Sequence, residues 1–379
     1  MPEGPSSVEL FGGAGGLSAA MDRAGFRHLL VNELDRRACQ TLRANSDWPL
    51  APGDVREVDF TPLAGRVDVV AGGVPCQPWS LGGAHGGYSD PRNLWPQLFR
   101  CVRETRPRAV LAENVRGLLR PSFAPYYDYI LRELALPHER RVDGEDWRDH
   151  DRRLVKALAA DRADPSERYD VHCLPVNAAD YGVPQIRRRV FVVAFRRDQH
   201  QAEWQPPAAT HSEAALAHAQ HTGTYWARHH HPTASRGIPR GESRISPDGL
   251  APWRTLRDAI ADLPEPVGDR VEHPDWLHHY GWPGARAYKG HTPNELDRPA
   301  KTVKAGVHGV PGGESVLRRD DGTLRYLTVR EVARIMTFPD DWELAGPRGE
   351  QMRQLGNAVP VRLGEVMARA VLAGLARSQ

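Results

Sequence analysis

Short apolar runs alternate with amphipathic stretches over the first 200 or so residues of the chain. Five runs rich in Val, Leu, Phe and Ala predict strands, and they cover residues 7–11, 28–32, 67–71, 108–112 and 189–195. Apolar residues at helical spacing predict helices between these runs, over residues 16–25, 35–45 and 93–105. Strands that alternate with helices of this length predict parallel βαβ units, and therefore an α/β fold with a mostly parallel sheet.

The pattern changes after about Asp198. From there to about Gly322 the sequence is rich in His, Gly, Pro and Trp and has little periodicity, which predicts a smaller, irregular, β-rich domain. Helical pattern returns at Thr328, which has capping-box spacing to Glu331, and a last helix is expected from near Pro360. We therefore expect a catalytic and cofactor-binding domain over 1–198, a second domain over 199–322, and C-terminal helices over 323–379 that return to the first. The charged stretch 140–167 is expected to be a partly mobile insertion.

Composition narrows the class of protein. The 50 basic and 48 acidic side chains of the 379 residues nearly cancel, so a nucleic-acid partner would need a local basic cluster. The four cysteines, at 39, 76, 101 and 173, form no Cys-x-x-Cys pair and are too sparse for a disulfide framework. Without a signal peptide or an apolar run of membrane-spanning length, we expect a soluble cytoplasmic protein.

A glycine-rich turn follows the first predicted strand. The segment Phe11-Gly12-Gly13-Ala14-Gly15-Gly16 places backbone N–H groups at a helix N-terminus and lets a ligand approach closely, but it lacks dinucleotide spacing. Glu33 follows the second strand, where an acid can hold a ribose diol. Asp54 stands in a turn that closes the same side. Each residue alone fits an ordinary turn or cap, but their order favours an adenosine cofactor without phosphate, such as S-adenosylmethionine.

Cys76 is the candidate nucleophile. It follows a predicted strand and lies between Pro75 and Pro78, so its turn is conformationally restricted at the edge where α/β sheets place their chemistry. A buried structural role is more common for a free cysteine and suits Cys39, Cys101 and Cys173, which lie inside predicted helices or strands.

Further candidates follow the next strands. Glu113 comes directly after a strand, so adjacent parallel strands would bring it near Cys76, and a buried rim favours the protonated form that a general acid needs. Arg187 and Arg189 precede and enter the 189–195 strand, where period-two alternation puts both on one side. Two guanidinium groups there suit an anionic or carbonyl-rich ligand. The plainer interpretation of Glu113 is an acid at the start of a helix, and that of the arginines is a solvated basic run.

Together these segments resemble the cytosine-C5 DNA methyltransferases. The resemblance rests on six motifs in the family's order, namely Glu9–Leu17, Val74–Pro78, Glu113–Val115, Gln185–Arg189, Arg298–Val303 and Gln354–Pro360, and covers essentially the whole chain outside about 200–295. The chain departs from the usual pattern at Glu9, where the family has Asp, at Trp79, where Phe is common, and at Lys301, where Pro is common. None of these changes removes a reacting group.

The resemblance implies a Rossmann-like fold, a reaction and a set of site residues. Cys76 would attack C6 of an extruded cytosine, Glu113 would contact N3, Arg189 would contact O2 and Arg187 would support the pocket. The methyl donor would be S-adenosylmethionine, with S-adenosylhomocysteine as product and no metal. The implied cofactor contacts are Phe11, Gly12, Gly13, Ala14, Gly15, Gly16, Leu17, Glu33, Leu34, Asp54, Val55, Pro75, Leu94, Asn357, Ala358 and Val359.

The region from about 199 to 322 would then be the target-recognition domain for double-stranded DNA. The run His229-His230-His231 is expected to be a solvated loop rather than a metal site. Because the first motif comes so early, we expect a stand-alone, monomeric prokaryotic enzyme that associates with the nucleoid through DNA. It would be the modification arm of a restriction system, with a cognate endonuclease as a possible partner.

Three alternatives stay open. The first is a tRNA cytosine-C5 methyltransferase of the same superfamily, which the recognition region of about 100 residues disfavours. The second is a catalytically inactive DNA-binding homologue, which the presence of Cys76, Glu113 and Arg189 disfavours. The third is a nicotinamide oxidoreductase, which rests on the glycine turn alone.

Overall fold

The structure is a computed structural model of the whole chain. It describes residues 4–75, 93–199, 203–230, 246, 248–286, 292–305 and 315–376. The predicted nucleophile Cys76 and Trp79 therefore lie outside the described residues. Contacts divide the chain into two compact units. The first comprises residues 1–176, 188–207 and 364–379, and the second comprises residues 177–187 and 208–363. This division by contacts differs from the three-part division by function, which stays a prediction.

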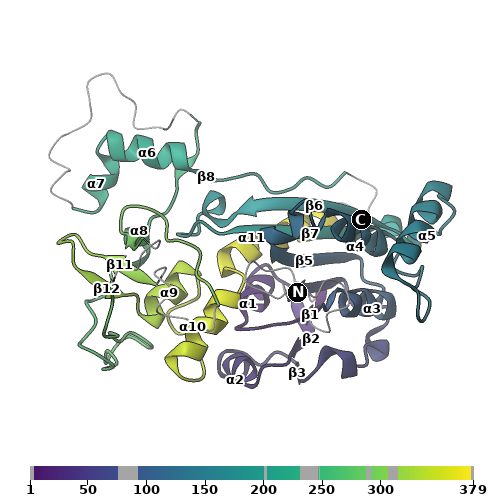
Figure 1. Cartoon of the computed structure of the whole chain (residues 1–379), viewed down its shortest axis with the longest axis horizontal. Coiled ribbons are helices and arrows are strands. Elements are labelled where there is room, and N and C mark those ends of the chain that lie inside the picture. Colours follow the sequence, from purple (N-terminus) through teal and green to yellow (C-terminus); the bar gives the residue numbers. More distant parts are fainter. Residues whose placement is uncertain are drawn as a thin grey trace. The chain divides into compact units, whose positions relative to one another are not determined.

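A seven-stranded sheet forms the centre of the first unit (Figure 1). Its strands are β1 (Ser6–Leu10), β2 (Arg27–Glu33), β3 (Leu50–Pro52), β4 (Val69–Gly73), β5 (Ala109–Val115), β6 (Tyr169–Asn177) and β7 (Arg188–Arg196). The order across the sheet is β3-β2-β1-β4-β5-β7-β6, and the pairs from β3 to β5 are parallel. The five strands predicted from the apolar runs are thus confirmed, within three residues at each end. The predicted α/β fold with a mostly parallel sheet is confirmed too.

One strand differs from the parallel expectation. β7 pairs with β5 in the antiparallel direction, with Glu113 opposite Phe191 and Val115 opposite Arg189. The reason lies in the connection, because β6 intervenes between the helices after β5 and the start of β7, so the chain re-enters the sheet from the opposite end. The periodicity of β7 alone does not distinguish the two directions, since both give a buried apolar run.

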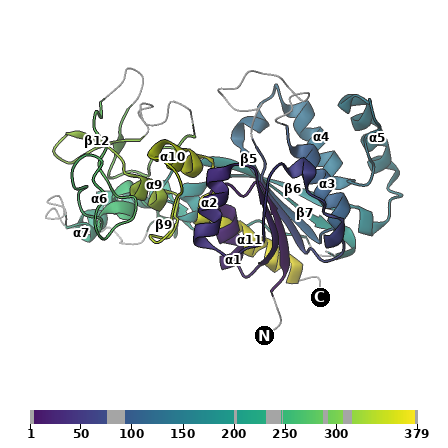
Figure 2. The ribbon, with the colours of Figure 1, turned by 90° about the horizontal axis from the view of Figure 1, so that it is seen from below.

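Helices cover both faces of this sheet (Figure 2). The helices are α1 (Gly16–Arg23), α2 (Arg36–Asn45), α3 (Trp95–Thr105), α4 (Ala124–Ala135), α5 (Trp147–Ala160) and, from Gly364 onward, α11 (Val361–Ala376). On the face with α3 and α4, fully buried Leu98, Phe99 and Ile130 pack against Val70 and Val110 of the sheet. On the other face α11 approaches so closely that a Cβ on Gly374 would lie 2.6 Å from the Phe195 ring.

The segment 140–167 is not the mobile insertion that its charge predicted. It contains the fourteen-residue helix α5, whose buried face carries Trp147, His150 and Leu154. Trp147 packs edge-on against Tyr126 at 5.2 Å between ring centroids, and the Tyr129 hydroxyl lies 3.0 Å from Nδ1 of His150. Four buried side chains therefore hold α5 against α4. The high charge of the sequence describes only its outer face.

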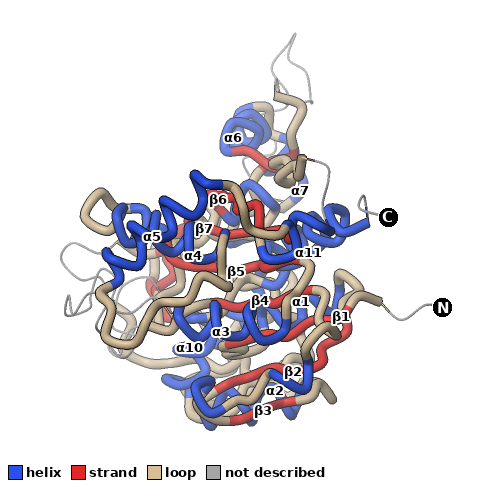
Figure 3. Tube along the Cα trace, turned by 90° about the vertical axis from the view of Figure 1, so that its right-hand side faces the viewer, coloured by secondary structure: helices blue, strands red, loops and turns tan. Residues whose placement is uncertain are grey.

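The second unit contains smaller sheets and several short helices, and its strands are red and its helices blue in the tube of Figure 3. Strands β10 (Asn294–Glu295), β11 (Val316–Arg318) and β12 (Leu324–Tyr326) form one sheet, and β8 (His211–Ser212) pairs with β9 (Ala251–Pro252). The helices are α6 (Glu213–His221), α7 (Thr224–Arg228), α8 (Leu256–Ile260), α9 (Val329–Ile335), α10 (Arg348–Asn357) and the first residues of α11. The predicted capping box is present, because Thr328 and Glu331 bond reciprocally to each other's backbone N–H.

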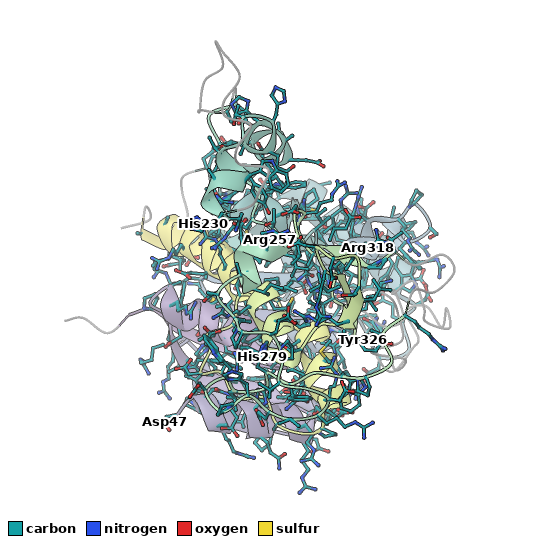
Figure 4. The ribbon with its side chains drawn as sticks, turned by 90° about the vertical axis from the view of Figure 1, so that its left-hand side faces the viewer. Asp47, His230, Arg257, His279, Arg318 and Tyr326 are labelled. Atoms are coloured by element: carbon teal, nitrogen blue, oxygen red, sulfur yellow. The ribbon has the colours of Figure 1, made fainter. Side chains whose placement is uncertain are left out.

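Ion pairs tie the short elements of the second unit together. Arg257, labelled in Figure 4, donates from Nε to Asp297 at 2.7 Å and from Nη2 to Asp320 at 2.6 Å. Asp297 also accepts the Tyr225 hydroxyl at 2.8 Å. Because short strands and helices bury little apolar surface, such polar cross-links are the means by which this irregular region holds one conformation.

Candidate active site

The glycine-rich turn between β1 and α1 has the backbone that a ligand cradle needs. Phe11, Gly13 and Gly15 all have positive φ angles, of 62°, 56° and 84°. A left-handed conformation is costly for Phe11, and such strain concentrates at functional turns. A Cβ on Gly12 would lie 2.8 Å from Val31, so the turn also lies tight against β2. The turn thus exposes backbone where bulkier residues would not fit.

Glu33 supports this turn from the end of β2. Its Oε2 accepts the Gly13 N–H at 2.7 Å and its Oε1 accepts the Asp35 N–H at 2.6 Å. Burial raises the pKa of Glu33, although these two hydrogen bonds oppose the rise. The carboxylate predicted to hold a ribose therefore also stabilises the turn through these hydrogen bonds. Each oxygen accepts one of these backbone bonds and retains capacity for a hydroxyl donor.

The other predicted contacts of the first unit vary in exposure. Asp54 caps a short 3-10 helix, with its pKa lowered mainly by the Arg56 N–H that it accepts, and Val55 beside it is buried. Leu34 is 68 % exposed. Pro75 and Leu94 are half-buried at the two ends of the segment that lies outside the described residues. Ala14, Gly16 and Leu17 are buried at the start of α1.

Glu9 is a feature that sequence reasoning noted only as a departure from Asp. It is 1 % exposed in the middle of β1, and neither carboxylate oxygen has a hydrogen-bond partner among the described residues. The pKa of Glu9 is raised to about 8, mainly because the carboxyl group is buried. The nearby Ser18 hydroxyl lowers this pKa, and the charge of Glu33 raises it. An acid between Val8 and Leu10 in a predicted strand was the signal available in the sequence.

The predicted catalytic edge of the sheet is formed by the ends of β4 and β5. Gly73 pairs with Glu113, the Val74 N–H donates to the Glu113 carbonyl at 3.1 Å, and Asn114 Nδ2 donates to the Val74 carbonyl at 3.1 Å. A Cβ on Gly73 would lie 3.9 Å from Glu113 Oε2. The Glu113 carboxylate therefore lies over the strand end from which the chain leads to Cys76.

Arg189 reaches the same carboxylate from β7. Its Nε lies 2.7 Å from Glu113 Oε1, and the two side chains are 11 % and 9 % exposed. The pairing follows from the antiparallel register, because Arg189 is diagonal to Glu113 across the β5–β7 pair and so lies on the same face. The expectation that Glu113 acts as a general acid stays a prediction.

Arg187 does not share these surroundings. It lies just before β7, belongs by contacts to the second unit, and donates to three backbone carbonyls. The acceptors are Val303 at 2.9 Å, Gly356 at 2.8 Å and Ala358 at 2.9 Å. Strand alternation predicted one side for both arginines, but it does not extend to Arg187 because the strand begins only at Arg188.

The predicted cofactor residues of the second unit lie at the C-terminal end of α10 and directly after it. Asn357 is the last residue of the helix and is exposed, whereas Ala358 and Val359 are buried. Gly356 is required here, because a Cβ would lie 2.5 Å from the backbone N of Ala305.

The remaining cysteines and the histidine run were partly misjudged. Cys39 and Cys101 are buried as expected, but Cys173 is exposed on β6, with its sulfur 2.6 Å from the Tyr127 hydroxyl. His229 is not in a solvated loop, since its Nε2 lies 2.8 Å from Asp258. Within the described ranges, no group of three His, Cys, Asp or Glu could hold a metal ion, and no helix is both long and apolar enough to cross a membrane.

Comparison with known proteins bears on what this site does. The model of the family described as C-5 cytosine-specific DNA methylase matches residues 6–135 and 165–373. The chain is 32% identical over 375 residues to Type II methyltransferase M.Eco47II of Escherichia coli, covering 96% of this chain and 78% of that protein. It is 31% identical over 372 residues to Type II methyltransferase M.NgoMIV of Neisseria gonorrhoeae, covering 98% of both chains.

Solved structures agree on the fold. A putative DNA modification methyltransferase encoded within an E. coli prophage superimposes with a TM-score of 0.59 at 19% identity, over 98% of this chain and 99% of that one. The S. pombe Dnmt2 methyltransferase gives 0.59 at 15% identity, over 98% of both. The family match spans both units and omits residues 136–164, the stretch that contains α5. By sequence and by fold, the chain belongs to the C-5 cytosine-specific DNA methylases and is a DNA cytosine-5 methyltransferase.

Proposed function

We propose that the enzyme methylates C5 of a flipped-out cytosine in a specific duplex DNA site, as the modification enzyme of a restriction system. The relatives named Type II methyltransferases support the biological role. The site residues support the reaction, since a carboxylate and a guanidinium lie together at the strand edge that leads to Cys76. A cytosine must leave the stack to meet such a buried edge.

S-adenosylmethionine is the proposed methyl donor, and the residues present fit it. The left-handed turn at Phe11–Gly15 leaves room for close backbone approach, and the buried Glu9, whose carboxylate oxygens have no hydrogen-bond partner in the described part of the chain, suits the cationic part of a ligand. Glu33 and Asp54 would face the ribose and adenine side, with Leu34, Val55, Pro75 and Leu94 around it. Asn357 to Val359 would complete the site. When bound, the cofactor supplies an electrophilic methyl group on a sulfonium.

The proposed chemistry begins at Cys76. Its thiol loses a proton, and the thiolate sulfur bonds to C6 of the cytosine. The electron pair of the C5–C6 double bond forms a C4–C5 double bond, and the pair of the C4–N3 double bond passes to N3. N3 takes a proton from Glu113, so no charge accumulates on the base. The proton that the Cys76 thiol releases would pass through solvent to Glu113, which lies beside Arg189, and from Glu113 to N3.

The remaining steps restore the aromatic ring. S-adenosylmethionine, held by the residues named above, would supply the methyl group that C5 of the neutral adduct receives. A base then removes the C5 proton, the C5–C6 double bond re-forms, and the Cys76–C6 bond breaks with return of the thiolate. The N3 proton returns to Glu113. The observation that carries this proposal is the Glu113–Arg189 pair on a single face of the sheet, and these two groups would contact N3 and O2.

Methyl transfer tests the proposal. Labelled methyl should pass from S-adenosylmethionine to duplex DNA and not to total tRNA, and transfer to tRNA alone would refute a DNA substrate. Cys76→Ser should abolish transfer while duplex binding survives, and Cys173→Ser is the matched control because Cys173 is exposed on β6. A duplex carrying 5-fluorocytosine at the target should trap wild-type protein covalently and leave Cys76→Ser free. Bisulfite sequencing of DNA from an expressing, methylation-free host would identify the site.

A further inference from the structure

The guanidinium group of Arg187 has an unusual set of partners. The side chain is 1 % exposed, and it donates to three backbone carbonyls, those of Val303, Gly356 and Ala358, at 2.8–2.9 Å. A buried arginine usually neutralises an acid, because an isolated charge is costly to desolvate. Here carbonyl dipoles accept hydrogen bonds from the guanidinium group. Three such hydrogen bonds fix the backbone of two separate segments relative to one side chain.

The helix end explains why carbonyls suffice. α10 ends at Asn357, and the last carbonyls of a helix have no intrahelical N–H partner. A cation at the C-terminus is stabilised both by these carbonyls and by the helix dipole. Arg187 bonds to the carbonyls on either side of Asn357 and therefore caps α10. The exposed Asn357 is held between two fixed, buried neighbours.

The residues before Arg187 hold the other segment. Gln185 Oε1 accepts the Val303 N–H at 3.1 Å, and the Thr302 hydroxyl donates to the Ile186 carbonyl at 2.7 Å. Gly356 lets this segment approach α10 backbone to backbone. The segment 302–305 and the end of α10 therefore form one rigid body around Arg187.

We infer that Arg187 is a positioning residue for the cofactor, which sets the conformation of Asn357 and its neighbours, and is not part of the cytosine pocket. The inference rests on the proposed role of Asn357 to Val359 in binding S-adenosylmethionine. It separates two arginines that strand periodicity assigns to one pocket. Arg189 pairs with the carboxylate at the catalytic edge, whereas Arg187 holds a helix terminus.

Steady-state kinetics of Arg187→Met and Arg187→Lys test this assignment, with Arg188→Met as control because Arg188 is exposed one residue away. Arg187→Met should raise KM for S-adenosylmethionine, and Kd measured by calorimetry, by about tenfold or more. At saturating cofactor, kcat and the KM for duplex DNA should stay close to wild type. Arg187→Lys should recover part of the affinity, and Arg188→Met should match wild type.

A second variant perturbs the same segments without touching the arginine. Gly356→Ala should raise the cofactor Kd in the same way, because its Cβ would displace the backbone at Ala305. Gly349→Ala in the same helix is its control, since no atom lies within 4 Å of a Cβ there. If Arg187→Met proves unfolded by circular dichroism, Arg187→Lys and Gly356→Ala decide the matter.

The outcomes separate this inference from the proposed function. A loss of kcat at saturating cofactor, with unchanged cofactor Kd, would place Arg187 in the cytosine pocket and overturn the inference. Unchanged cofactor affinity in Arg187→Lys and Gly356→Ala would overturn it as well. If the wild-type protein binds no S-adenosylmethionine and transfers no methyl group, the proposed function itself fails.

Discussion

The Arg189 guanidinium lies 2.7 Å from the Glu113 carboxylate across the antiparallel β5–β7 pair, and both side chains are about nine-tenths buried. The pair holds together the two groups that the proposed reaction needs at O2 and N3, which are neighbours on one edge of the cytosine ring. In the free protein each group satisfies the charge of the other. In the proposed reaction, substrate entry would exchange this ion pair for two contacts to the base.

Removal of either partner should be costly for both stability and activity. Loss of one member of a buried pair typically costs about 3–5 kcal/mol, so Arg189→Met and Glu113→Gln should each lower the free energy of unfolding by that order. The double variant should lose less than the sum of the two, as measured by denaturant unfolding. Additive losses would mean that the two groups do not interact. Glu113→Gln should also lower kcat by about 100- to 10,000-fold with duplex affinity retained.

Glu9 should make the stability of the protein depend on pH. Its pKa of about 8 lies above the ordinary value of 4.5, so the folded state binds the proton more tightly than the unfolded state. The stabilising effect of the protonated form is complete below about pH 4.5 and is lost as pH rises through 8, at about 1.4 kcal/mol per unit of pH in between. Glu9→Gln should remove this slope, and its melting temperature should exceed that of wild type most clearly at pH 8.

The control for Glu9 is Glu57→Gln, because Glu57 is exposed. Thermal unfolding between pH 5 and pH 9, without cofactor, gives both slopes. If wild type and Glu9→Gln show the same pH dependence, Glu9 is not held protonated.

Helix α5 should be an integral part of the first unit. Trp147 is 5 % exposed against Tyr126 and Tyr129, so Trp147→Ala should cost about 3–5 kcal/mol of unfolding free energy. Val155 on the same helix is 47 % exposed, and Val155→Ala should change stability by less than about 0.5 kcal/mol. Chemical denaturation checks both. A Trp147→Ala variant as stable as wild type would restore the original expectation of a loosely held insertion.

The capping box of α9 offers a local test. The Thr328 hydroxyl accepts the Glu331 N–H at 3.0 Å and also lies 3.0 Å from Nδ1 of His279, labelled in Figure 4. Thr328→Ala should therefore cost at least the roughly 1 kcal/mol expected of a lost N-cap. Thr328→Ser keeps the hydroxyl and should be close to wild type. Equal stability of the Ala and Ser variants would show that the cap contributes nothing.

The sequence by itself determined the features that depend on local order. The alternation of apolar runs and helical stretches specified β1, β2, β4, β5 and β7 and the helices α1, α2 and α3, because each period is imposed by the geometry of its element. The capping box joins Thr328 to Glu331, only three residues apart, so the sequence predicted it without knowledge of the fold. The six motifs in order identified the family, since each is a short run of neighbouring residues that can be read without the fold.

Only the tertiary structure decided which residues share surroundings. The direction of β7 depends on where β6 inserts, and that direction brings Arg189 to Glu113. Arg187, two residues away, is assigned by acceptors 116 to 171 positions distant in the chain. The charge of 140–167 concealed a helix because burial concerns only one of its faces. Periodicity describes a side chain relative to its own element, whereas these roles depend on neighbours that long-range packing supplies.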